Sequence, residues 1–172
     1  RVPLVAPERI SKELVPMLRA AAPLFIVLHA NHASEFTEAG EAACARLVDA
    51  GIPMLGQTVL LRDVNDDAES LETLMRRLVE NRIKPYYLHH ADRANGTGHF
   101  RTTIVAGRAL AAGLRGRVSG LCQPDYVLDI PGGHGKSPLG QSYVRDCDDG
   151  SHDVMDYSGR WHRYGSCCPR LP

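Results

Sequence analysis

The chain has 172 residues, enough for one domain with a hydrophobic core of its own. Its 20 basic and 20 acidic side chains cancel, so composition gives no sign of non-specific binding to nucleic acid or to an anionic membrane. No apolar run approaches the roughly 20 residues that a membrane-spanning helix needs.

Helix and strand signals alternate along the first 130 residues. Helices are marked by apolar side chains at helical spacing and by residues typical of their ends, such as Thr37 as an N-cap and Gly51 as a C-terminal stop. The apolar run at 24–28 is continuous, which predicts a strand buried on both faces. In chain order the predicted elements are a helix over 11–22, a strand over 24–28, a helix over 37–50, a strand over 54–61, a helix over 67–81, a strand over 84–88, a helix over 103–114 and a strand over 126–128.

This alternation predicts an α/β fold built from parallel strand–helix units. In such sheets the functional residues gather where the strands end. Polar residues stand at or near those ends: His29, Asn31 and His32; Gln57 and Arg62; His89, His90 and Asp92; and Asp129 to Lys136. From 144 to 172 the sequence is polar, contains glycines and clusters Asp146, Asp148 and Asp149, and we expect a loosely structured tail rather than a second domain.

The segment from Asp129 to Pro138 places Lys136 at the end of a glycine-rich turn, directly after a predicted strand. A lysine presented in this way can hold a phosphate as a point charge or form a Schiff base. Half of the phosphate-binding loop G-x-x-x-x-G-K-[ST] is matched, but its first glycine would fall on Ile130. A glycine-rich surface turn with a solvated lysine is the third interpretation.

The five cysteines show no C-x-x-C pair, and their odd number and irregular spacing fit reduced thiols in a cytoplasmic protein. Cys44 falls in a helical pattern and is expected to be buried. A metal site at Cys167 and Cys168, with His152 and His162 upstream, is a minor alternative.

Short blocks of sequence carry a family resemblance: Arg1-Val2-Pro3, His29-Ala30-Asn31-His32, residues 56–62, Val64-Asn65-Asp66, residues 85–88 with Asp92, His99-Phe100-Arg101, residues 113–116 and Asp129 to Lys136. Together these blocks resemble the C-terminal half of the lysine 2,3-aminomutases, radical S-adenosylmethionine enzymes that also use pyridoxal phosphate. The resemblance covers about residues 1–143 and implies the C-terminal part of a partial (β/α) barrel of the radical S-adenosylmethionine type, with parallel strands. Because the chain begins at Arg1 without a methionine, we expect a fragment of a longer protein.

By this resemblance, Lys136 would be the catalytic lysine that holds pyridoxal phosphate as a Schiff base. Asp92 and Asp129 would bind the distal ammonium of a lysine substrate, which is costly to bury without paired anions. His29 and Gln57 would face S-adenosylmethionine. The ligands of the [4Fe-4S] cluster are expected outside this chain, so the segment alone would be inactive, and no metal site is assigned within it.

The sequence also departs from the family. His89-His90-Ala91 replaces a more aromatic segment, which leaves the contacts around the pyridoxal ring open. Asp67 stands where members can carry a cysteine, so no zinc site is carried over. Arg101 and Arg115 could serve phosphate, but solvated charges or local salt bridges are the simpler interpretation.

The implied reaction is the interconversion of L-lysine and β-lysine by a radical 1,2-amino shift in a cytoplasmic isomerase. Its partner would be a small cationic amino acid, with no nucleic acid or membrane, and a homo-oligomer is compatible with it. Related aminomutases that act on a translation factor or on glutamate remain alternatives, although two carboxylates would repel glutamate's distal carboxylate. Outside this class, a nucleotide-phosphate-binding module and a non-catalytic half-barrel stay open.

Overall fold

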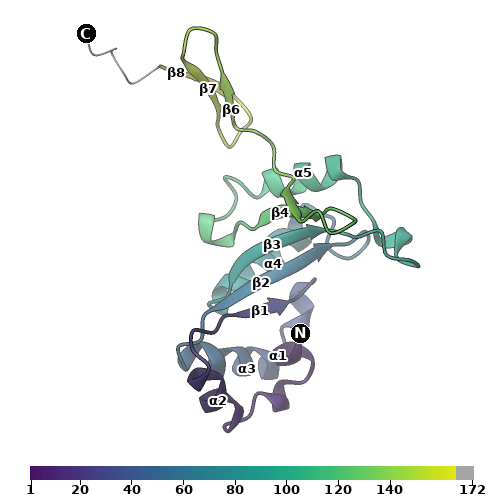
Figure 1. Cartoon of the computed structure of the whole chain (residues 1–172), viewed down its shortest axis with the longest axis vertical. Coiled ribbons are helices and arrows are strands. Elements are labelled where there is room, and N and C mark those ends of the chain that lie inside the picture. Colours follow the sequence, from purple (N-terminus) through teal and green to yellow (C-terminus); the bar gives the residue numbers. More distant parts are fainter. Residues whose placement is uncertain (166–172) are drawn as a thin grey trace.

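The computed structural model describes residues 1–165, and its main feature is a five-stranded sheet in the order β1-β2-β3-β4-β5 (Figure 1). The first four strands are parallel, and β5 is antiparallel to β4. These strands are β1 (Ile26–His29), β2 (Met54–Leu60), β3 (Lys84–His90), β4 (Asp125–Asp129) and β5 (Lys136–Pro138). The predicted α/β class with a mainly parallel sheet is therefore confirmed.

Helices connect the parallel strands, as the sequence predicted. The α-helices are α1 (Val2–Val5), α2 (Leu14–Ala20), α3 (Glu38–Asp49), α4 (Ala68–Glu80) and α5 (Ile104–Gly113). Short 3₁₀ helices also lie along the described chain: η1 (Pro7–Arg9), η2 (Ala33–Glu35), η3 (Gly98–Phe100) and η4 (Gly120–Cys122). Side-chain caps fix where the long helices begin: Thr37 accepts from Gly40 N at 3.2 Å, and Asp67 and Thr103 cap α4 and α5 in the same way.

The core lies between the sheet and these helices, and two glycines let backbone approach closely there. A Cβ on Gly56 of β2 would lie 3.0 Å from the side chain of Leu78 in α4. A Cβ on Gly107 of α5 would lie 2.0 Å from the hydroxyl oxygen of Tyr126 in β4. Both contacts place α4 and α5 on the same face of the sheet, where Leu60 and Leu88 are fully buried.

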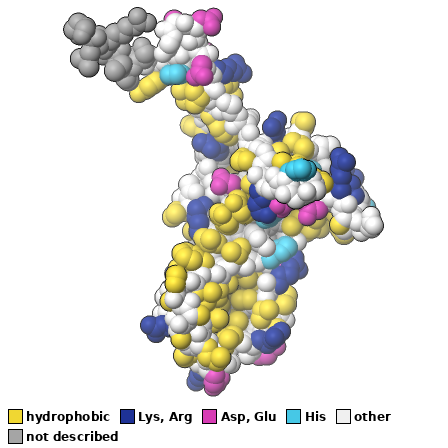
Figure 2. All heavy atoms as spheres, in the orientation of Figure 1, with side chains coloured by type: hydrophobic (Ala, Val, Ile, Leu, Met, Phe, Trp, Pro, Cys, Tyr) yellow, Lys and Arg dark blue, Asp and Glu magenta, His cyan; other side chains and the backbone are white. Residues whose placement is uncertain are grey.

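The opposite face of the sheet is open, which corrects one prediction. β1 was expected to be buried on both faces, but the side chain of Val27 is 42% exposed and that of Phe25, just before the strand, is 62% exposed. The reason is that helices of the described chain cover only the other face of β1, where Leu28 is buried. Figure 2 shows hydrophobic side chains gathered over the part of the molecule where β1 and the first helices lie.

The glycine-rich turn is a β-hairpin, so Lys136 begins an edge strand rather than a helix. Ile130 N donates to Gly135 O at 2.9 Å to close the turn, and Gly133 and Gly135 adopt φ of +80° and +85°, which side chains rarely tolerate. Since a phosphate-binding loop must lead into a helix, the phosphate-loop interpretation of Lys136 is wrong.

The segment expected to be a loosely structured tail contains a second, antiparallel sheet that projects from the first (Figure 1). Its strands are β6 (Val144–Asp146), β7 (His152–Met155) and β8 (Trp161–Tyr164). Side-chain contacts hold these strands together: Arg145 of β6 lies 3.7 Å over the ring of Trp161 in β8, and His152 Nδ1 of β7 lies 3.0 Å from its cross-strand partner Asp146 Oδ1. The polar composition that suggested disorder supplies these pairs.

Among the described residues, no helix combines the length and apolar character that crossing a bilayer requires.

Candidate functional site

The open face of the sheet carries most of the residues singled out from the sequence. Paired residues of neighbouring strands point to the same side of a sheet. His29 lies opposite Gln57 on β1 and β2, and Asp129 lies opposite Lys136 on β4 and β5. His89 of β3 reaches Asp129 across the same face. Strand pairing thus brings together side chains that lie far apart in the sequence: His29 with Gln57, and His89 with Asp129.

Asp129 is held between two basic groups at one edge of this face. Lys136 Nζ donates to Asp129 Oδ1 at 2.5 Å, and His89 Nδ1 lies 3.3 Å from Asp129 Oδ2. The hydrogen bond from Lys136, followed by the charges of Lys136 and His89, lowers the pKa of Asp129 below its usual value. The side chains of Lys136 and Asp129 remain 42% and 38% exposed, so the pair is accessible to a ligand.

The imidazole of His89 has one nitrogen without a partner. Its Nε2 is buried and makes no hydrogen bond within residues 1–165, and the ring of Tyr87 meets it edge-on at 5.5 Å. The sequence marked His89 as a polar residue at a strand end and as a departure from an aromatic pattern, but it assigned no role to it. Its contact with Asp129 depends on the pairing of β3 with β4, which no local signal in the sequence reports.

A cavity of about 520 Å³ opens at the carboxyl ends of β3 and β4. It brings Asp92 and Asp129 together, as their common predicted role requires, whereas Lys136 is not among the residues that line it. Asp129 therefore belongs both to the ion pair with Lys136 and to the cavity. The lining residues are His90, Ala91, Asp92, Arg93, Arg101, Thr102, Ile104, Leu128, Asp129 and Pro131.

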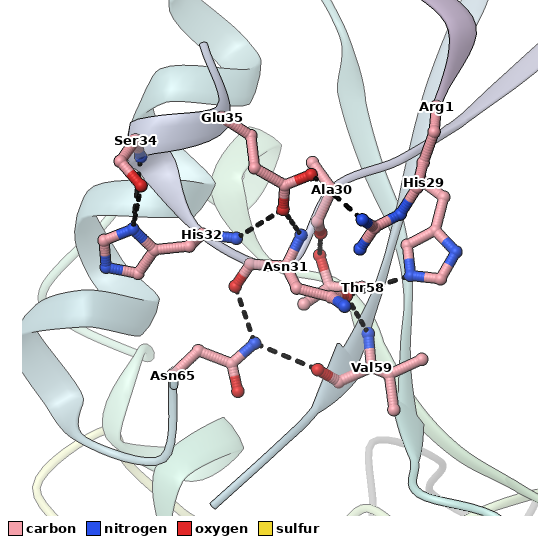
Figure 3. A network of polar contacts seen from close by, with 10 residues as sticks. All are labelled: Arg1, His29, Ala30, Asn31, His32, Ser34, Glu35, Thr58, Val59 and Asn65. Carbon is pink, nitrogen blue, oxygen red and sulfur yellow. Dashed lines mark hydrogen bonds and ion pairs between the residues drawn. The ribbon is translucent and has the colours of Figure 1, made fainter. Parts of the chain in front are cut away.

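The loops after β1 and β2 are joined by two buried asparagines (Figure 3). Asn65 Nδ2 donates to Asn31 O at 2.8 Å and to Val59 O at 2.9 Å, while its Oδ1 accepts from Leu61 N at 2.8 Å. Asn31 Oδ1 accepts from Val59 N at 3.0 Å and lies 2.9 Å from His29 Nε2. The sequence marked both asparagines as parts of blocks but did not reveal that they fix these strand ends.

His29 and His32 have separate roles. Burial lowers the pKa of His29, which favours a neutral ring, and the hydrogen bond to Asn31 opposes this shift. His32 Nδ1 instead lies 2.7 Å from Ser34 Oγ and caps η2 (Figure 3). The two histidines thus make separate contacts, and no group of three potential metal ligands occurs in the described part of the chain. Cys167 and Cys168 lie outside the described residues.

Comparisons with known proteins give relatives for most of the chain, although no family model matches it. It is 45% identical over 144 residues to L-lysine 2,3-aminomutase of Clostridium subterminale and 46% identical to that of Acetoanaerobium sticklandii. A glutamate 2,3-aminomutase of Clostridioides difficile is 37% identical over 144 residues. These matches cover 84% of this chain, which spans about a third of the length of the curated relatives (35%, 35% and 34%).

Proposed function

Because this chain belongs to the lysine 2,3-aminomutase family, we propose that it supplies the coenzyme-binding and substrate-binding residues of an isomerase that interconverts L-lysine and β-lysine. The observation that carries this proposal is that Asp129 contacts Lys136 and also lines the cavity. It accepts a hydrogen bond from Lys136, the candidate coenzyme lysine, and lines one cavity with Asp92. Asp129 therefore connects the other two groups that the function requires: its carboxylate accepts from the amine of Lys136 and shares a cavity with the carboxylate of Asp92.

The residues around Lys136 fit pyridoxal phosphate. An amine, a carboxylate and an imidazole with a buried, unpartnered Nε2 lie side by side on the open face of the sheet. When bound, pyridoxal phosphate supplies an aldehyde and a conjugated ring that carry the migrating amino group. Lys136 would hold it covalently through Nζ, and Asp129 Oδ1 would then lose its present donor.

Two anions in the cavity would select the substrate. With Lys136 engaged, Asp129 and Asp92 would together bind the distal ammonium of L-lysine, since a buried cation needs paired anions. His89 would keep Asp129 in place through its other carboxylate oxygen. The glutamate branch is disfavoured because these two carboxylates would repel the distal carboxylate of glutamate.

At the other end of the open face, His29 and Gln57 would bind S-adenosylmethionine. They are direct neighbours across β1 and β2, and the asparagine network fixes the loop that follows His29.

We propose that the four parallel strands are part of a (β/α) barrel of the radical S-adenosylmethionine type, whose interior is the open face. The ligands of the [4Fe-4S] cluster are assigned outside these residues. The enzyme would be cytoplasmic, where free thiols such as Cys44 and Cys122 persist.

The substrate assignment is tested with Asp92→Asn in the full-length enzyme, which is cleaner than changing Asp129 because Asp92 makes no contact with Lys136. We expect β-lysine formation at subsaturating L-lysine to fall roughly tenfold or more, the value of a charge-assisted hydrogen bond. Binding of pyridoxal phosphate should be unchanged. Asp148→Asn, in an exposed turn between β6 and β7, is the matched control. Equal loss in both variants, or activity on L-glutamate instead, would contradict the assignment.

A further inference from the structure

Two polar groups at the wall of the cavity have no partner. Arg101 Nε and Thr102 Oγ1 are both buried and make no hydrogen bond within residues 1–165. Both residues line the cavity that contains Asp92 and Asp129. Buried polar groups are almost always hydrogen-bonded in folded proteins, so two neighbouring exceptions in one cavity wall point to a missing acceptor.

Arg101 differs from the solvated or locally paired arginine that the sequence suggested. No ion pair is formed by Arg101 within the described chain, and its guanidinium is held close to Gly98, where a Cβ would lie 3.3 Å from Nη2. Arg115, by contrast, has its guanidinium carbon 4.1 Å from the centre of the Tyr143 ring, away from this cavity. A partly buried guanidinium without an anion is costly, and an oxyanion ligand would remove that cost.

The two carboxylates of the cavity do not serve as this anion. Neither Asp92 nor Asp129 lies within ion-pair distance of Arg101, and Asp129 is engaged with Lys136 and His89. The cavity therefore keeps negative and positive side chains apart within one space of about 520 Å³. Such a space fits ligands that carry charges of both signs, as an amino acid or a phosphorylated coenzyme does.

We propose that Arg101 and Thr102 form an oxyanion subsite of this cavity, which binds either the phosphate of pyridoxal phosphate or the carboxylate of the amino-acid substrate. This inference rests on the proposed function, because it takes its ligands from that reaction. The fixed fork of a guanidinium matches both oxyanions, and the Thr102 hydroxyl adds one donor beside it.

Pairs of ligands that differ only in the oxyanion test the subsite. Pyridoxal phosphate is compared with pyridoxal by absorbance titration, and L-lysine with cadaverine, which lacks the carboxylate, by calorimetry on the coenzyme-loaded protein. In full-length Arg101→Gln we expect the oxyanion-bearing member of one pair to bind roughly tenfold or more weakly, with its counterpart unchanged. Arg101→Lys should recover part of the loss, and Thr102→Val should show a smaller loss of the same selectivity. Arg115→Gln is the matched control.

The pattern across the pairs decides the outcome. Loss confined to pyridoxal phosphate assigns the phosphate, and loss confined to L-lysine assigns the carboxylate. Equal effects on both members of each pair, or no effect in Arg101→Gln and Thr102→Val, overturn the subsite. Wild-type protein that binds no coenzyme through Lys136 contradicts the proposed function instead. The subsite is then judged by calorimetry of L-lysine against cadaverine on the coenzyme-free wild type and Arg101→Gln, where equal binding of L-lysine by both proteins overturns it.

Discussion

The carboxylate of Asp129 is placed to accept a hydrogen bond from Lys136 and also to contact a ligand in the cavity. Lys136 contacts one oxygen and His89 the other, so the side chain is held from both sides while it still faces the cavity. Ionised Asp129 is the form that these contacts stabilise, as its lowered pKa indicates. The free lysine and a cationic substrate would thus compete for the same oxygen, and coenzyme attachment at Lys136 would end that competition.

Because Lys136 is the main cause of this shift, removing it should change the pKa of Asp129 most. We expect Lys136→Met to raise the pKa of Asp129 further than His89→Phe does, as followed by carboxyl carbon NMR during an acid titration. The folded-state pKa is depressed, so the stabilisation by this pair is present above the ordinary aspartate pKa and is lost as pH falls through the folded-state pKa. A larger shift in His89→Phe would contradict this order.

At the scale of single elements, side-chain amides hold the strand ends where the site is formed. Asn65 is fully buried and satisfies three backbone groups at the ends of β1 and β2: Asn31 O and Leu61 N in the loops that follow these strands, and Val59 O within β2. Backbone groups at the end of a strand have no neighbouring strand to pair with, and burial makes an unpaired group costly. The asparagines therefore make an irregular buried segment possible beside His29.

Removal of the Asn65 amide should destabilise the whole fold. Asn65→Ala leaves Leu61 N, Asn31 O and Val59 O unpaired, and we expect the free energy of unfolding to fall by about 2–4 kcal/mol. Urea denaturation measures this change. Asn95→Ala, in an exposed turn, should alter stability by less than about 0.5 kcal/mol. Similar values for both variants would show that the network is not structural.

Helix α5 offers a second matched pair, because its two glycines differ in surroundings. Gly107→Ala would drive a methyl group into Tyr126, and we expect a loss of about 1–3 kcal/mol in the free energy of unfolding. Gly113→Ala meets nothing within 4 Å and should stabilise the helix by about 0.5–1 kcal/mol. Thermal unfolding of the two variants compares them directly. A tolerated alanine at 107 would mean that α5 does not pack this closely on β4.

Elements with strong local signals were predictable, and contacts between distant segments were not. The caps at Thr37, Asp67 and Thr103 fixed the starts of three helices because each depends on residues two to three positions away. The sequence did not predict the open face beside Val27, because a continuous apolar run does not show whether one or both faces of its strand are covered. The roles proposed for Asp92, Asp129 and Lys136 came from the resemblance, and they remain proposals.

At the scale of the whole molecule, the two sheets differ in how they are stabilised. The hydrophobic core of the described residues contains nothing beyond Leu139, so β6–β8 contribute none of it. The second sheet is held by ion pairs and the Arg145–Trp161 contact, and it joins the first after Tyr143. The main sheet in turn leaves one face open, where the proposed site lies.

Removal of residues 144–172 should therefore leave the first sheet folded. We expect the thermal midpoint of the truncated protein to stay within a few degrees of the parent, since no buried apolar side chain of the described core is lost. Differential scanning calorimetry of the two proteins makes the comparison. A large drop in the midpoint would show that the second sheet supports the first.

Chemical trapping of the coenzyme shows directly whether Lys136 is the residue that holds it. Full-length protein is incubated with pyridoxal phosphate, reduced with borohydride and digested, and the labelled peptide is identified by mass spectrometry. We predict that the label lies on Lys136 and disappears in Lys136→Ala, while Lys84, which donates to Pro85 O and Gln123 O, stays unlabelled. A label on another lysine, or no label, would contradict the assignment of Lys136 as the lysine that holds pyridoxal phosphate.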